Sequence, residues 1–97
     1  MIMETTLNES SVVVAADRVT SAEVDGESVL LDLEEGIYYG LNHTGAQVWS
    51  EIQEPAEVQE ITAAIADEYD VDSEACFEDV ISLLRDLKEN DLIKIRT

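Results

Sequence analysis

The segment that decides the fold is VLLDLEEGIYYGLN at residues 29–42. Residues 29–33 form an apolar, strand-prone run, and the turn at residues 34–36 ends in a glycine that can take a positive φ. Residues 37–41 form a second strand-prone run with two adjacent tyrosines. Asn42 has the side-chain oxygen of a helix N-cap, so the pattern predicts a β-hairpin that leads straight into a helix.

Short strands are predicted on either side of this segment. They cover residues 12–14 and 19–24, and a closing strand is expected over residues 93–95. The dipeptide Asp25-Gly26 separates the second of these runs from the hairpin segment and is typical of a two-residue hairpin turn. Strands that precede helices predict an α+β domain, with an N-terminal three-stranded antiparallel β-sheet followed by three α-helices.

The three helices are predicted in the second half of the chain. The first runs from about residue 43 to residue 52 and ends before Pro55. Apolar residues then recur at helical spacing, and Pro55 suits the start of this second helix. The third helix is capped by Asp72 or Ser73 and ends near Asn90.

The candidate core combines both halves of the chain. Leu31, Leu84 and Trp49 are expected to carry the fold. Because side chains alternate along a strand, one of Tyr38 and Tyr39 should pack toward Trp49 and the helices, while the other faces outward.

The apolar side of the third helix is wide, covering an arc of roughly 160°. Its residues are Cys76, Phe77, Val80, Ile81, Leu83, Leu84 and Leu87. One interpretation is that the whole arc is core. The other is that the edge at Cys76 and Leu83, which Asp79 and Asp86 border, stays open as the wall of a groove.

The chain resembles the PqqD-like family, small proteins that recognise the leader peptides of ribosomally made peptide natural products. The resemblance rests on the pattern LLDLE-G-YYGLN--G--VW from Leu30 to Trp49 and extends over about residues 12–95. Asn90 stands where the family usually has a glycine. The resemblance implies a winged helix-turn-helix-like arrangement.

The resemblance also implies a peptide chaperone that is not an enzyme and uses no cofactor or metal. It captures the leader segment of a precursor peptide by strand addition and delivers it to a modifying enzyme, either a leader protease of a lasso-peptide pathway or a radical-SAM enzyme. The peptide-binding residues expected on the two walls of the groove are Ile37, Tyr38, Tyr39, Gly40 and Leu41 on the strand, and Cys76, Asp79, Val80, Leu83 and Asp86 on the helix.

Composition argues against several partners. The 97 residues carry 23 acidic and 5 basic side chains, so nucleic acid and anionic membrane surfaces should repel the chain. The acidity either serves solubility or favours a leader with lysine or arginine nearby. With one cysteine and no secretory signal, we expect a cytoplasmic monomer or weak homodimer. One domain is expected over residues 12–97, behind a flexible N-terminus at residues 1–11.

The residues do not indicate catalysis, and two other classes of function remain open. His43 is the one histidine and Cys76 the one cysteine; Cys76 falls on an apolar arc without a neighbouring base. A winged-helix transcriptional regulator is one alternative, although the acidic third helix would be repelled by phosphates. An acyl carrier-like protein is the other, suggested by Asp72-Ser73, although Glu74 follows where a leucine is typical.

Overall fold

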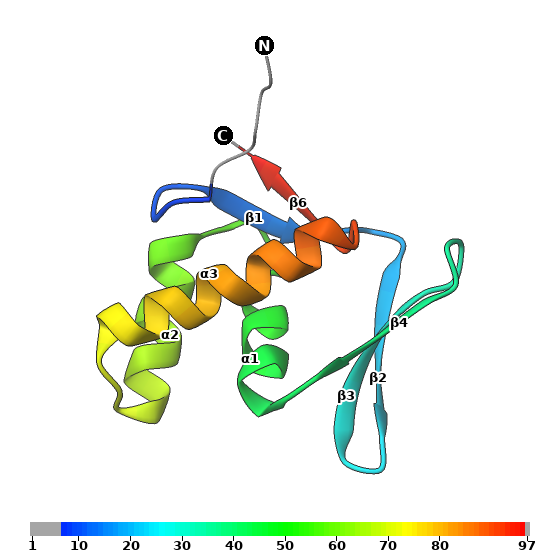
Figure 1. Ribbon diagram of the computed structural model, residues 1–97, viewed down its shortest axis with the longest axis horizontal. Coiled ribbons are helices and arrows are strands. Elements are labelled where there is room, and N and C mark those ends of the chain that lie inside the picture. The colour runs from blue at the N-terminus through cyan, green and yellow to red at the C-terminus, as the bar shows by residue number, and fades with distance from the viewer. Residues whose placement is uncertain (1–6, 97) are drawn as a thin grey trace.

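The computed structural model describes residues 7–96, in which four strands precede the first helix and two further strands lie among and after the helices. The elements are β1 (Val12–Ala15), β2 (Val19–Val24), β3 (Glu27–Asp32), β4 (Ile37–Leu41), α1 (His43–Glu51), β5 (Ala56–Glu57), α2 (Val58–Tyr69), α3 (Ser73–Glu89) and β6 (Ile93–Arg96) (Figure 1). This arrangement confirms the predicted α+β class; the winged-helix comparison stays a prediction. None of the helices between residues 7 and 96 is both long and apolar enough to cross a bilayer.

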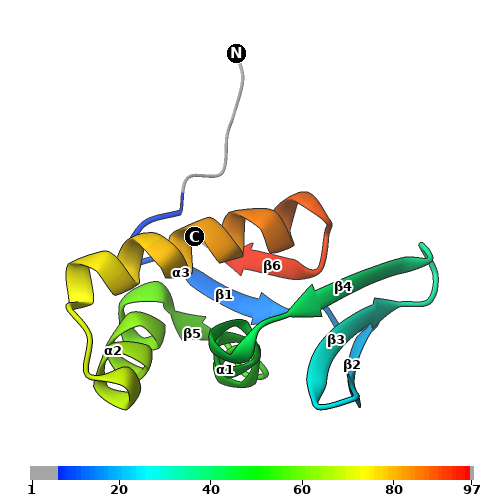
Figure 2. The same cartoon turned by 60° about the horizontal axis from the view of Figure 1, so that its bottom comes forward.

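The first sheet is three-stranded and antiparallel, as predicted, and its strand order is β2-β3-β4. Val24 lies opposite Glu27, which leaves Asp25 and Gly26 as a two-residue turn. Both turn residues have positive φ, 54° and 81°, as a hairpin turn that matches the strand twist requires. This sheet projects to one side of the helices, and β4 runs back from it toward α1 (Figures 1 and 2).

A second antiparallel sheet has the order β5-β1-β6 and joins the two ends of the described chain. Val12 lies opposite Arg96, and Ala15 lies opposite Ile93. The strand predicted at residues 12–14 therefore forms, but in a different sheet from its neighbours in sequence. The predicted closing strand also forms, as β6.

The second helix starts later than Pro55, where we expected it. Ala56 and Glu57 pair with β1 instead and form β5. The Glu57 N–H donates to Oε1 of Glu60 at 3.0 Å, so the helix begins at Val58 behind a capping box. Pairing with β1 satisfies backbone groups that a helical start at the proline would have left for solvent.

The other two helices begin as predicted, behind side-chain caps. Oδ1 of Asn42 accepts a hydrogen bond from the Gly45 N–H at 2.7 Å. Oδ2 of Asp72 accepts one from the Ala75 N–H at 3.4 Å, so Asp72 rather than Ser73 caps α3. Each cap satisfies a backbone donor that has no partner inside its helix.

The core lies where the three helices meet both sheets. Its fully buried side chains include Val13, Leu30, Val48, Ile52, Val58, Ile61, Leu84, Leu87 and Leu92. Leu84 and Trp49 are buried, as predicted, but Leu31 is only half buried and its neighbour Leu30 takes the core position.

The segment before β1 is tied to the domain from Leu7 onward, whereas we expected a flexible tail up to residue 11. Leu7 packs in the core cluster. The Gln59 N–H donates to the Glu9 carbonyl at 3.0 Å, and the Val58 N–H donates to the Ser11 carbonyl at 2.9 Å. Residues 1–6 of the expected tail lie outside the described residues.

Candidate functional site

β4 is an edge strand with one open side. Among the described strands it pairs only with β3, with Leu30 opposite Tyr39 and Asp32 opposite Ile37. Its second side therefore presents a row of backbone N–H and C=O groups that another extended segment can pair with. Gly40 lies on this strand, and a Cβ added there would meet nothing within 4 Å, so the strand is uncrowded at that point.

A hollow of about 400 Å³ lies between the start of α1 and the middle of α3. Its lining residues are Asn42, Thr44, Gly45 and Val48 on the α1 side, and Asp79, Val80, Ser82, Leu83 and Asp86 on α3. The buried Val48 and Val80 give it an apolar floor, and the exposed Asp79 and Asp86 give it an acidic rim. The hollow suits a peptide whose apolar side chains have a lysine or arginine close to them.

Tyr39 connects β4 to this hollow. Its side chain is half buried and packs against the core cluster. Burial, the negative charge of Asp86 and a hydrogen bond to that carboxylate together raise the pKa of Tyr39. The hydroxyl of Tyr39 therefore lies beside Asp86 of the acidic rim, while the hollow itself is lined by α1, α3 and Asn42 and by no residue of β4.

Gly45 allows α1 to begin directly at the end of β4. A Cβ at this buried position would lie 3.1 Å from Cδ2 of Leu41 and 3.2 Å from Oδ1 of Asn42, closer than most real Cβ contacts. A larger residue would push against both the last residue of the strand and the helix cap. The glycine thus holds the α1 wall of the hollow close to β4.

Four of the five α3 residues predicted for the groove line this hollow: Asp79, Val80, Leu83 and Asp86. The fifth, Cys76, does not. It is buried in the core, and its Sγ–H donates to the Thr62 carbonyl of α2 at 3.6 Å. Burial and then the charge of Asp79 raise the pKa of the Cys76 thiol, which keeps it protonated. The edge of α3 proposed from the sequence therefore lines the hollow at its middle, whereas α2 covers it at Cys76.

The predicted β4 residues divide between the two faces of the sheet. Ile37 and Tyr39 pack against the core, and Leu41 is buried in it. Tyr38 and Gly40 point to the opposite face, and Tyr38 is 66% exposed. Tyr38 is therefore not on the wall that faces α3. The hollow is instead lined on this side by residues of α1, which the sequence analysis missed. The helix cap Asn42 and the helical Gly45 mark their position in the sequence.

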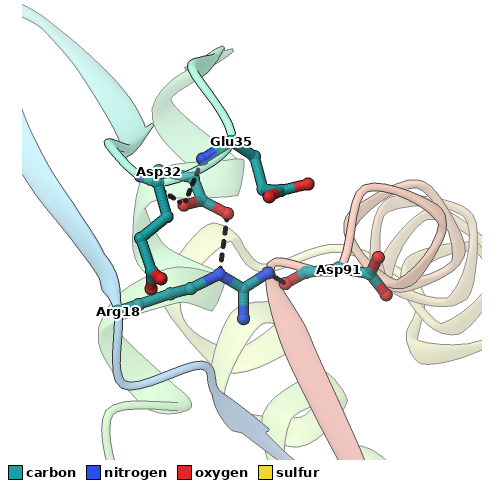
Figure 3. A network of polar contacts seen from close by, with 5 residues as sticks. Arg18, Asp32, Glu35 and Asp91 are labelled. Atoms are coloured by element: carbon teal, nitrogen blue, oxygen red, sulfur yellow. Dashed lines mark hydrogen bonds and ion pairs between the residues drawn. The ribbon is translucent and has the colours of Figure 1, made fainter.

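A buried carboxylate links the hairpin to the far end of α3 (Figure 3). Asp32 is fully buried; its Oδ2 pairs with Nε of Arg18 at 2.9 Å, and its Oδ1 accepts from the N–H groups of Glu34 and Glu35 at 3.2 and 3.3 Å. Nη2 of Arg18 also donates to the Asp91 carbonyl at 2.8 Å, in the turn between α3 and β6. We call this set the Arg18 clamp. It holds the β3–β4 turn, and so the direction of β4, relative to α3.

His43 and Cys76, from which the sequence analysis expected no catalysis, contact different partners. His43 is exposed at the start of α1, where its ring lies edge-on to Tyr69 with centroids 5.9 Å apart. Cys76 lies under α2 and bonds to Thr62. Within residues 7–96 no group of three or more His, Cys, Asp or Glu side chains is arranged to hold a metal ion.

The Tyr39–Asp86 contact gives a first prediction. Asp86→Asn should lower the pKa of Tyr39 toward its ordinary value, because removing the carboxylate charge makes the tyrosinate less unfavourable. The titration can be followed by NMR of ring-labelled tyrosine. Asp79→Asn removes the same charge from the other rim position and should leave Tyr39 unchanged; an equal effect of both variants would show that Asp86 has no special contact.

The chain is similar to one protein family and to solved structures of leader-peptide complexes. The family model described as coenzyme PQQ synthesis protein D (PqqD) matches residues 27–93. A solved structure of TbiB1 in complex with the TbiA(beta) leader peptide is similar, with 38% identity and a TM-score of 0.75 over 84% of this chain and 94% of that chain. A lasso peptide synthetase B1 complexed with the leader peptide is also similar, with 26% identity and a TM-score of 0.74 over 84% of this chain and 96% of that one. No curated protein matches the chain.

Proposed function

Because the chain belongs to the PqqD family, we propose that it binds the leader segment of a precursor peptide and presents it to a modifying enzyme. The observation that carries this proposal is the open edge of β4 beside a hollow with an apolar floor and an acidic rim. The two similar solved structures support it, since both are complexes with leader peptides. The chain itself catalyses no step of the modification.

The proposed mechanism is strand addition. The leader pairs through its main chain with the open side of β4, and this pairing supplies affinity for any extended segment. Side chains alternate along the added strand, so every second residue of the leader points to the face that carries Tyr39 and α3. Apolar residues at these positions enter the hollow over Val48, Val80 and Leu83, and a lysine or arginine next to them pairs with the rim.

The partner that receives the leader is a leader protease or a radical-SAM enzyme, and the exchange takes place in the cytoplasm. In this scheme the chain contributes by raising the local concentration of the precursor at the enzyme. The precursor should therefore be unchanged in mass after incubation with this chain alone.

Binding can be tested with the TbiA(beta) leader and with the leader of any precursor peptide that is encoded beside the gene for this chain. We expect roughly micromolar or tighter binding by calorimetry, a range that a modest preformed groove supports. The amide groups of residues 37–41 should gain protection from hydrogen exchange, because strand addition occupies them. A leader of scrambled sequence is the control. Absence of both heat and amide shifts with either leader would refute the proposal.

A further inference from the structure

The sheet β2-β3-β4 has a second face, which is turned away from the hollow and from the core. Strand register places Ala22 opposite Val29 and Leu31 opposite Tyr38, and alternation along β2 adds Val24 to the same side. We call these five apolar residues the outer face; the polar Thr20 and Glu27 lie on the same side, opposite Leu31 and Val24. The outer face is turned away from the sheet side that carries Leu30 and Tyr39, which packs on the core.

The outer face is more apolar than a solvated sheet surface. In an antiparallel sheet with one buried face, the other face normally carries polar residues. Here Tyr38 is 66% exposed, Val24 is 47% exposed and Leu33 in the adjoining turn is 80% exposed, whereas Leu31 is half buried and Val29 is buried between them. These are three of the four large apolar side chains that are exposed within residues 7–96. Such a concentration on one small sheet is typical of an interaction surface.

The charged side chains of the three strands of this sheet and of the two turns between them are all acidic. Residues 19–41 contain no lysine or arginine, and their carboxylates are Glu23, Asp25, Glu27, Asp32, Glu34 and Glu35. The clamp to Arg18 neutralises Asp32 alone. The other five are exposed; Asp25 and Glu27 lie at one hairpin end of the sheet, and Glu34 and Glu35 lie at the other. The outer face thus has acidic side chains at both hairpin ends of the sheet.

We propose that the outer face docks the modifying enzyme, through an apolar patch on that enzyme that is bordered by lysine and arginine. This charge pattern disfavours a second copy of the chain as the occupant, because a copy would bring the same carboxylates and no cation from its own sheet. The inference rests on the proposed function, because it takes the enzyme that receives the leader as the partner.

The position of the outer face couples the enzyme to the leader. A strand added to the open side of β4 extends the sheet, and its outward side chains lie next to Tyr38. The enzyme therefore contacts the chain and the bound leader on one continuous surface. It binds the leader complex more tightly than the free chain, and by linkage the enzyme tightens leader binding by the same factor.

The test uses the leader protease or radical-SAM enzyme that acts on the same precursor, with leader binding and enzyme binding measured separately. Val24→Lys and Tyr38→Lys each place a cation in the apolar part of the outer face, and each should weaken enzyme binding by about tenfold or more. Val24 lies on β2, the strand farthest from the leader edge, so Val24→Lys should change leader affinity by less than about threefold. Val71→Lys is the matched control, because Val71 is 50% exposed in the link between α2 and α3; it should change neither affinity.

The outcomes separate this inference from the proposed function. Unchanged enzyme binding by both outer-face variants would overturn the inference while leader binding stands. A parent chain that binds no leader would overturn the proposed function. A parent that is a dimer by light scattering and becomes monomeric in Val24→Lys would show that a second copy covers the outer face, which also overturns the inference.

Discussion

Replacement of Leu83 by aspartate should weaken leader binding by on the order of a hundredfold while the chain stays folded. Leu83 is half buried on α3 and lines the hollow between Asp79 and Asp86. A carboxylate there would be desolvated by the bound leader and would lie next to two like charges. The cost is about 3 kcal/mol, or on the order of a hundredfold in affinity. Calorimetry with the leader measures the loss.

The matched control is Leu33→Asp, which makes the same change at a position that is 80% exposed and outside the hollow. This variant should bind the leader as the parent does. Circular dichroism and urea unfolding check that both variants are folded. If folded Leu83→Asp binds the leader normally, the hollow is not the site, and the side of α3 at Phe77, which lines a separate hollow against α2, becomes the next surface to test.

Asp32→Ala should lower the free energy of unfolding by about 2–3 kcal/mol, because it removes the centre of the Arg18 clamp. The guanidinium of Arg18 loses its ion pair, and the N–H groups of Glu34 and Glu35 lose their acceptor. The Arg18 side chain is 33% exposed, so solvent compensates part of the loss, and the expected value falls below that for a fully buried pair. Urea unfolding gives the difference.

The same variant should also weaken leader binding, since the β3–β4 turn is no longer held to the end of α3. Glu34→Ala removes an exposed carboxylate from the same turn but keeps its N–H bond to Asp32, and should change stability by no more than about 0.5 kcal/mol. Asp32→Asn retains an acceptor for the turn and should fall between the two. Parent-like stability of Asp32→Ala would mean that burying the carboxylate costs as much as the clamp contributes.

The turns of the first sheet and the cap of α1, which depend only on residues close together in the chain, were predicted correctly from the sequence. Asp25-Gly26 forms the hairpin turn, Gly36 takes a positive φ of 69°, and Asn42 caps α1. In each case the required conformation or hydrogen bond involves residues within about one turn of the chain, so residue type alone selects it. The α+β class follows from the order in which these local elements occur.

The sequence pattern could not show which side chains of β3 face the core. Val29, Leu30 and Leu31 are all apolar, so the run lacks the alternation that separates a buried face from an exposed one. The structure buries Leu30 in the core and leaves Leu31 half exposed on the outer face. For the same reason the sequence predicted that Tyr38 and Tyr39 face opposite sides without indicating which of them faces α3.

Other features arise from contacts between distant parts of the chain. β1 leaves its sequence neighbours and pairs with β5 and β6, and this pairing moves the start of α2 to Val58. The bond from Arg18 to the Asp91 carbonyl spans 73 positions. Cys76 leaves the groove because α2 packs over it. Local patterns carry no information on which remote segment meets a given face, since burial and charge pairing are settled only when the helices and sheets pack together.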